Sequence, residues 1–358
     1  MNITVVGGGN VGTQIAVHCA EKGHRVTLFT SKPEKFSKKL SIIDECDRLL
    51  HEGEIYRASA DEAEAFCEAD AVFVTMPAYC MGDLAARMLV YLPAHASIGL
   101  VPGTGGGECA FAPHVSRGGT VFGLQRVPSV ARLVEYGKTV RATGYRERLH
   151  VAALPACKAE QIAATVGEIF DMPCTPLPNY LNVTLTPSNP ILHTTRLRSI
   201  FADYTVGKSY ARVPLFYEEW SDESSELLLA CDAEVQALCA AMPFALSFVK
   251  SLREHYESDS AEALTKKIRS IKGFKGLPTP SVAVEGGFAP DLDSRYFVAD
   301  FSFGLSILVQ IAAFYGTDVP HMKQTLAWYE GISRHKEEYS FADFGITDKE
   351  SFEKFYQQ

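Results

Sequence analysis

The sequence lacks several features that mark particular classes of protein. No apolar run reaches the ~18 residues that a membrane-spanning helix needs. The nine cysteines are scattered between Cys19 and Cys239, without a CxxC pair and without a Cys/His grouping typical of a zinc site. The start of the chain has no basic segment followed by a long apolar one, so a signal peptide is not predicted. We therefore expect reduced thiols, no metal, no membrane association and a cytoplasmic location.

Long clusters of positive charge are also missing. The net charge is -9, and no basic stretch exceeds a few residues, which argues against a nucleic-acid partner. The chain is 47% hydrophobic and 22% charged, as is typical of globular proteins, and its 358 residues predict two domains. We expect small-molecule substrates as partners, and a homodimer is the candidate assembly.

Short β-rich runs alternate with helical patterns through the first part of the chain. This alternation predicts parallel strands joined by helical crossovers. Expected strands are Ile3–Val6, Arg25–Phe29, Ala71–Thr75, Ser97–Val101, Thr120–Leu124, Thr139–Thr143 and His150–Leu154, with the last three extending the same sheet. Expected helices are Val11–Lys22, Asp61–Glu68 and 81–92.

Beyond about residue 180, helical patterns dominate and strand patterns become rare. The expected helices are 194–204, 215–241, 244–257, 259–271, 303–315 and 320–330. A Pro-rich connector at Pro176–Pro187 separates the two parts. The predicted fold is therefore an α/β Rossmann domain with a parallel sheet (residues 1–180), followed by an all-α substrate-binding and catalytic domain (residues 181–358).

A glycine pattern of the form GxGxxG follows the first expected strand directly and opens the first expected helix. Gly7 permits a tight turn, Gly9 leaves room for a pyrophosphate, and Gly12 allows close packing of helix on strand. This context predicts a nicotinamide dinucleotide site, to which Asn10 and Val11 of the same loop also belong.

The residues after the second strand bear on the choice of cofactor. An NAD site usually has Asp or Glu there, whereas this chain has Thr30, Ser31 and Lys32. Hydroxyls and a cation suit a 2′-phosphate, which favours NADP(H), with NAD as the alternative because Lys32 can equally be a solvated loop charge. Met76, Pro77 and Thr104, at the ends of the next two strands, are further candidates for cofactor contact.

The second part of the chain contains two groups of candidate catalytic residues. Asn189 and His193 lie four residues apart near an expected helix start, which places both side chains on one face. A histidine can deliver a proton to a C=O or C=N group, although a histidine among apolar neighbours is often only structural. Further along, Arg295 offers a planar fork for a carboxylate, and Asp300 could orient an imidazole. A surface arginine and a helix-capping aspartate are the simpler alternatives.

The GxGxxG start, the segment SNPILHT (188–194), the segment SRYFVADFSFGL (294–305) and AAFYGT (312–317) together resemble the octopine/nopaline (opine) dehydrogenases. The resemblance implies an NAD(P)-dependent reductive condensation of an α-keto acid with the amino group of an amino acid, through an imine. It implies His193 as catalytic acid/base and Asp300 as its partner. Substrate binding is then assigned to Arg295 and Asn189, and also to Gln125 and Arg126 as candidates for the keto-acid carboxylate.

Two other functions remain open from the residues alone. A 2-hydroxy-acid or ketopantoate-type reductase has the same two-domain plan, but such enzymes commonly use a lysine donor that has no match here. A dinucleotide-binding sensor without catalysis is the other alternative, against which the set of His193, Arg295 and Asp300 argues.

Overall fold

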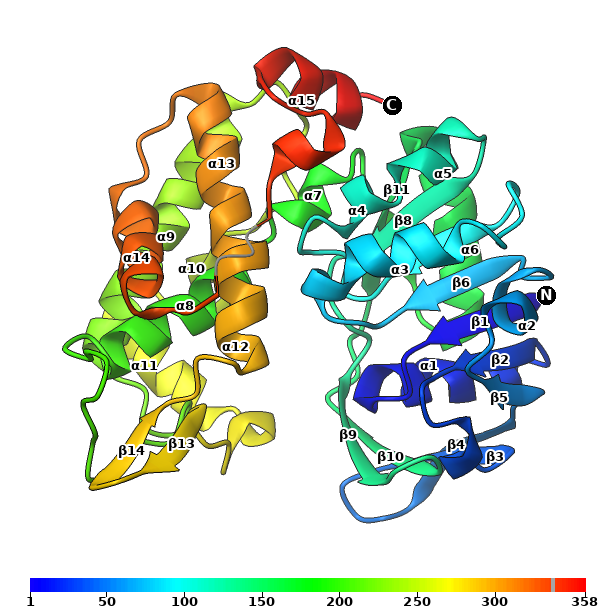
Figure 1. Cartoon of the computed structure of the whole chain (residues 1–358), viewed down its shortest axis with the longest axis horizontal. Coiled ribbons are helices and arrows are strands. Elements are labelled where there is room, and N and C mark those ends of the chain that lie inside the picture. The colour runs from blue at the N-terminus through cyan, green and yellow to red at the C-terminus, as the bar shows by residue number, and fades with distance from the viewer. Residues whose placement is uncertain (336–338) are drawn as a thin grey trace. The chain divides into compact units, whose positions relative to one another are not determined.

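The computed structural model describes residues 1–335 and 339–358. The chain forms two compact units, unit 1 (residues 1–184 and 354–358) and unit 2 (residues 185–353). Both units are drawn in Figure 1.

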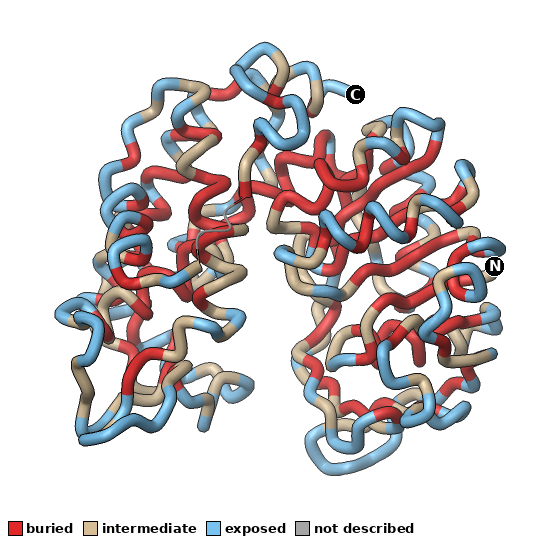
Figure 2. The backbone as a smooth tube through the Cα atoms, viewed as in Figure 1, coloured by how far each residue is buried: buried red, intermediate tan, exposed pale blue. Residues whose placement is uncertain are grey.

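Unit 1 is built on an eight-stranded sheet in the order β12-β11-β8-β7-β6-β1-β2-β5. Its strands are β1 (Asn2–Val6), β2 (Arg25–Phe29), β5 (Arg57–Ser59), β6 (Ala71–Val74), β7 (Ser97–Leu100), β8 (Thr120–Leu124), β11 (Leu149–Leu154) and β12 (Cys174–Pro176). All neighbours pair in parallel except β8 and β11, which are antiparallel. Strands β6 and β8 are buried along their whole length, as Figure 2 shows. The Rossmann fold predicted for the N-terminal part is confirmed.

A second, four-stranded sheet also belongs to unit 1, in the order β4-β3-β10-β9. Its strands are β3 (Lys39–Ile43), β4 (Leu49–Glu54), β9 (Val130–Glu135) and β10 (Thr139–Thr143). The expectation that Thr139–Thr143 extends the main sheet was therefore wrong. A strand pattern specifies an extended segment but not the partner with which it pairs.

Helix α1 (Asn10–Glu21) packs against β1, β2 and β6 of the main sheet and also against the strands of the second sheet. It is consequently buried from Gly12 to Cys19. The other helices of unit 1 are α2 (Glu62–Phe66), α3 (Met81–Met88), α4 (Gly107–Ala110), α5 (Ala112–Ser116), α6 (Ala159–Phe170) and α7 (Leu181–Thr184).

Unit 2 is mainly helical. Its helices are α8 (Asn189–Ile200), α9 (Asp222–Ala241), α10 (Leu252–Tyr256), α11 (Ala261–Ser270), α12 (Arg295–Phe297), α13 (Ser306–Tyr315) and α14 (Pro320–Ile332), with a π-helix at Val298–Leu305. Helix α15 (Lys349–Tyr356) ends in unit 1. The domain is not all-α, because β13 (Ser281–Val284) and β14 (Gly287–Pro290) form an antiparallel hairpin. These strands are short and mostly exposed, so they lack the apolar alternation that marks a half-buried strand.

The division of the chain differs slightly from the predicted boundary at 180/181. Helix α7 and the last five residues belong to unit 1. Helix α7 packs on β11, and the hydroxyl of Tyr356 donates to Glu108 at 2.8 Å. Such contacts between segments distant in sequence leave no signal in local composition.

Within the described residues, one helical stretch, Arg295–Tyr315, is long and apolar enough to cross a membrane by length and composition. Its most apolar window has a mean hydropathy of 1.8 and is 56% buried inside the protein. The stretch packs against α8, α9 and α14, so we interpret it as the central helix of unit 2.

Candidate active site

The glycine loop between β1 and α1 has the geometry of a phosphate-binding turn. Gly7 adopts φ +102°, and its amide donates to the carbonyl of Phe29 at 3.0 Å. A Cβ added at Gly12 would lie 1.8 Å from the carbonyl oxygen of Gly7, whereas one added at Gly9 would meet no atom within 4 Å. Gly12 is therefore required for packing, and Gly9 faces open space.

Helix α1 begins at Asn10, directly after Gly9 and the open space beside it. Its N-cap is Gly9, so no side chain occupies the first amide groups of the helix. Free amides and the positive end of the helix dipole suit a pyrophosphate, so these residues fit a dinucleotide. The side chain of Asn10 has a structural role, because its Oδ1 accepts a hydrogen bond from the amide of Leu133 at 2.7 Å. This bond connects α1 to β9. Val11 packs partly against the core of unit 1.

The three candidates after β2 differ in exposure. Thr30 is buried, and its hydroxyl oxygen accepts from the amide of Lys32 at 3.3 Å. This bond shapes the turn, while the side chains of Ser31 and Lys32 are exposed. Ser31 and Lys32 can therefore contact a ribose phosphate, whereas the buried Thr30 is less accessible to one.

Of the candidates beyond β6 and β7, Met76 is exposed and close to the glycine loop. Its Sδ lies 3.3 Å from the position of a Cβ added at Gly7. Pro77 and Thr104 are half-buried.

The glycine-rich segment after β7 is held by packing. A Cβ added at Gly103 would lie 2.6 Å from Cα of Gly123. The buried carboxylate of Glu108 accepts hydrogen bonds from Thr184 at 2.6 Å and from Tyr356 at 2.8 Å. Burial raises the pKa of this carboxyl, against the effect of those two donors.

Gln125 and Arg126 follow β8 directly and are half-buried. The side-chain amide of Gln125 donates to the carbonyl of Asn182 at 3.0 Å, which connects β8 to α7. Gln125 therefore has a structural role in unit 1.

The structure brings His193 and Asp300 together, although 107 positions separate them. Nδ1 of His193, on α8, lies 2.7 Å from Oδ2 of Asp300, on the π-helix. The two side chains are 4% and 15% exposed, so water screens this pair only weakly. A carboxylate on Nδ1 fixes the ring orientation and stabilises the imidazolium, which is the arrangement of an acid/base histidine.

Close approach of two helical elements makes this pairing geometrically feasible. A Cβ added at Gly304 would lie 3.0 Å from Cβ of Pro190, so the π-helix approaches the start of α8 closely at this glycine. The π-helix also contains a non-helical residue, Phe303, with φ -115° and ψ 17°. Such irregular turns are frequent at functional sites.

Sequence reasoning missed the aromatic residues around His193. The hydroxyl of Tyr217 lies 2.7 Å from Nε2, and the ring of Tyr296 stacks on the imidazole with centroids 4.2 Å apart. Phe216 contacts the imidazole edge-on at 5.4 Å. Tyr296 adjoins Arg295 in the segment singled out above, but no pattern in the sequence indicates Tyr217.

Arg196 positions the segment that carries Tyr217. It lies one turn after His193 on α8 and donates to the carbonyls of Phe216 at 2.9 Å and Glu219 at 2.7 Å. Burial lowers its pKa to about 10, so the guanidinium remains charged at neutral pH.

The proposed substrate binders of unit 2 are both exposed. Asn189 is the first residue of α8, and Arg295 is the first residue of α12. The guanidinium carbon of Arg295 lies 5.9 Å from the ring centroid of Tyr296, which itself stacks on His193. Asn189 and His193 both lie on α8 at the predicted spacing of four, which places them on one face, and Asn189 is exposed whereas His193 is buried.

Comparison with known proteins shows which proteins each part of the chain resembles. The model for the α-helical domain of NAD/NADP octopine/nopaline dehydrogenases matches residues 176–333, the segment that contains His193, Arg295 and Asp300. This part of the chain is therefore similar to the α-helical domain of the octopine/nopaline dehydrogenases. A second family model, the N-terminus of NAD-dependent glycerol-3-phosphate dehydrogenase, matches residues 2–103, which contain the glycine loop.

Several relatives match this chain over most of their own length. An uncharacterized protein of Sinorhizobium fredii is 29% identical, with 92% of this chain and 94% of the relative covered. Octopine dehydrogenase of Mizuhopecten yessoensis is 25% identical, with 92% and 89% covered. The solved structure of an octopine dehydrogenase with NADH and L-arginine is similar in fold, with a TM-score of 0.83, 21% identity and 98% and 97% covered. The chain is accordingly an NAD(P)-dependent oxidoreductase.

Proposed function

We propose that this enzyme condenses an α-keto acid with the amino group of an amino acid and reduces the resulting imine to a secondary amine dicarboxylate. The observation that carries the proposal is the His193–Asp300 pair, which is largely buried in unit 2 and has a geometry suited to proton transfer. When bound, the nicotinamide supplies the hydride.

The chain's own residues have the following proposed roles. His193 delivers the proton that the substrate nitrogen needs as the C=N bond is reduced, and Asp300 stabilises the charged imidazole. Arg295 binds a substrate carboxylate with its planar fork, and exposure leaves it accessible to solutes. Asn189 is a weaker candidate for a hydrogen bond to substrate, as are Gln125 and Arg126.

Tyr217 has a place in this scheme because its hydroxyl contacts Nε2, the nitrogen opposite Asp300. Substrate contact at Nε2 requires either that this hydroxyl moves away or that it passes the proton on. A phenol can both accept from an imidazolium and donate to a second acceptor, so it can pass the proton without a net change in its own charge.

For the cofactor, we propose a preference for NADP(H). The exposed Ser31 and Lys32 after β2 supply a hydroxyl and a cation, where an NAD site usually has a carboxylate.

The test is a matrix of keto acids against amino acids, each pair assayed with NADH and with NADPH by absorbance. We expect cofactor oxidation only when both a keto acid and an amine are present. Oxidation with the keto acid alone would indicate a hydroxy-acid reductase, and no oxidation across the matrix would indicate a non-catalytic sensor.

The same assay tests the residue that carries the proposal. His193→Ala should lower turnover by ~10²–10⁴-fold with cofactor affinity unchanged. The exposed His95→Ala, in unit 1, is the matched control and should retain full turnover. Wild-type turnover in the His193 variant would contradict the role of His193 while leaving the substrate matrix interpretable.

A further inference from the structure

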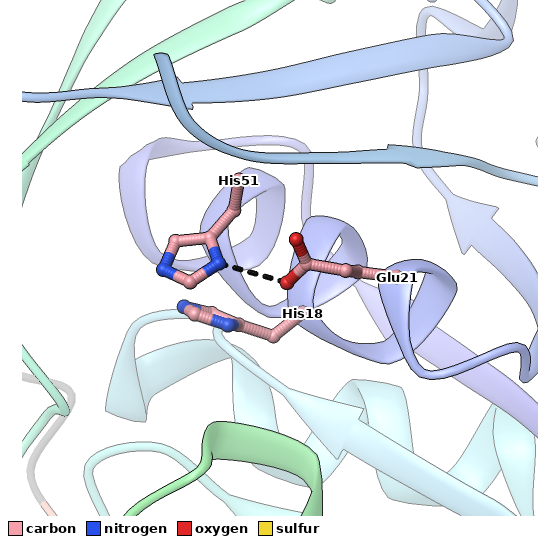
Figure 3. Close-up of side chains that lie close together, drawn as sticks. All are labelled: His18, Glu21 and His51. Atoms are coloured by element: carbon pink, nitrogen blue, oxygen red, sulfur yellow. Dashed lines mark hydrogen bonds and ion pairs between the residues drawn. The ribbon is translucent and has the colours of Figure 1, made fainter. Parts of the chain in front are cut away.

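Three side chains in unit 1 that could hold a metal ion converge at the C-terminal end of α1. His18 and Glu21 lie three positions apart on this helix, and His51 reaches them from β4 (Figure 3). One ligand atom from each of the three lies within 4.8 Å of the other two. Nδ1 of His51 is already 2.8 Å from Oε2 of Glu21, and the two imidazole centroids are 4.6 Å apart.

We propose that His18, Glu21 and His51 form a binding site for a divalent transition-metal ion, Zn²⁺ in particular. Two imidazoles, one carboxylate and an open fourth position for water are a ligand set that zinc adopts in proteins. The inference does not depend on the reaction proposed above, because it concerns the end of α1 opposite the glycine loop.

A second interaction prepares His18 for this role. Its Nε2 lies 3.1 Å from the hydroxyl of Tyr145. When Nε2 donates its proton to that oxygen, Nδ1 keeps a free lone pair for a metal. Ligating histidines almost always have such a partner on their other nitrogen, which fixes the tautomer and the ring orientation.

The charges around the three side chains leave room for a cation. Nearby charges are Lys22 and Asp171, which pair with each other and so largely offset their effects on a cation.

The site is accessible and close to the required dimensions. His51 and Glu21 are 29% and 34% exposed, whereas His18 is buried beneath them. Zn–N distances are about 2.0–2.1 Å, so ligand atoms around zinc lie roughly 3.3 Å apart. The more distant ligand atoms must therefore approach one another by at most about 1.5 Å, and the His51–Glu21 pair at 2.8 Å must move slightly apart, through rotation of the two partly exposed side chains.

The alternative is an ordinary surface hydrogen bond between His51 and Glu21 that happens to lie over a buried histidine. The chain offers a comparison, because His321 makes a similar bond to Glu234, at 2.7 Å. That pair is absent from the His/Cys/Asp/Glu groups of three found within the described residues.

The test uses full-length protein treated with a chelator, freed of it and titrated with ZnCl₂ by calorimetry. We expect one Zn²⁺ per chain, a thermal unfolding temperature that rises with Zn²⁺, and visible Co²⁺ absorption of tetrahedral intensity. His51→Ala and Glu21→Gln should each weaken binding by at least ~10-fold. Tyr145→Phe, which keeps all three ligands, should weaken it by ~10-fold.

His321→Ala is the matched control and should bind Zn²⁺ as the wild type does. The variants at His51 and Glu21 change partly exposed side chains, so loss of folding does not obscure the result. Absence of Zn²⁺ binding in the wild type, or equal affinity in wild type and His51→Ala, would overturn the proposal.

Discussion

The hydroxyl of Tyr217 lies 2.7 Å from Nε2 of His193, and Asp300 lies at the same distance from Nδ1. Both imidazole nitrogens therefore have a partner. Nε2, the nitrogen that would face a substrate, contacts the phenol hydroxyl of Tyr217. The ring of Tyr217 is itself fixed by stacking on Phe274, with centroids 4.1 Å apart. A substitution at Tyr217 can therefore test the proton-transfer role of His193 while the histidine itself is left unchanged.

Tyr217→Phe removes the hydroxyl and keeps the stacked ring. We expect kcat to fall about tenfold, the equivalent of one hydrogen bond of roughly 1.4 kcal/mol, and the pH profile of kcat to shift, with KM changed less. Steady-state kinetics across pH measures both effects. Tyr210→Phe, which removes a hydroxyl bonded to Asp203, is the control, and an unaltered pH profile in Tyr217→Phe would argue against the role of Tyr217.

Arg295→Lys keeps the positive charge but loses the planar fork. We expect the KM for the keto acid or the amino acid to rise about tenfold, because lysine cannot bind a carboxylate through two parallel hydrogen bonds. Arg253→Lys, on α10, should leave both KM values unchanged. If Arg295→Lys behaves as the control does, Arg295 is a surface residue without a part in substrate binding.

Lys32→Glu tests the cofactor preference. Hydrogen bonds to charged groups contribute about 1.5–3 kcal/mol, so we expect kcat/KM for NADPH to fall by ~10–100-fold and kcat/KM for NADH to be retained. Lys38→Glu, also exposed, makes the same charge change a few residues further on and serves as the control. A parallel loss with both cofactors in Lys32→Glu would show that Lys32 does not read the 2′-phosphate.

Asp232, on α9, gives a prediction about stability. Burial raises its pKa from 3.8 to about 6, even though its carboxylate accepts from the amide of Leu252 at 2.9 Å. The folded state thus binds this proton more tightly than the unfolded state. The charged form destabilises the fold above pH 6, and this penalty is relieved as the pH falls toward 4.

Asp232→Asn keeps an acceptor oxygen for Leu252 and removes the charge. Chemical unfolding at pH 7.5 should show a free energy of unfolding raised by up to about 3 kcal/mol, with a much smaller gain near pH 4. Asp318→Asn, at an exposed position, should show no such pH dependence. An equal increase in the free energy of unfolding at both pH values would mean that the charge of Asp232 does not cause the destabilisation.

Local pattern was sufficient to predict the Rossmann unit. Gly7, Gly9 and Gly12 lie between a strand and a helix that are adjacent in sequence, and each glycine's task follows from backbone geometry. His193 and Asp300 were candidates by residue type, and the resemblance to a family then assigned them as a pair. Their spacing of 107 residues carries no signal of contact.

The other parts of the two sites depended on contacts between distant segments, which no local sequence pattern encodes. Tyr217 meets His193 because Arg196 anchors the segment after residue 215 to α8, and His51 meets His18 because β4 packs on α1. The strand Thr139–Thr143 was recognised as a strand but assigned to the wrong sheet, because alternation of side chains fixes a strand's faces and not its neighbours.

The sequence by itself determined the dinucleotide-binding loop, the change from α/β to helical structure and the types of residue available for chemistry. These follow from turn geometry, periodicity and side-chain chemistry, which act over a few residues. Only the tertiary structure decided which groups meet: the tyrosine on His193, the carboxyl of Glu108 between Thr184 and Tyr356, and the cluster of His18, Glu21 and His51. Such meetings depend on the packing of whole elements, which brings together side chains that lie far apart in the chain.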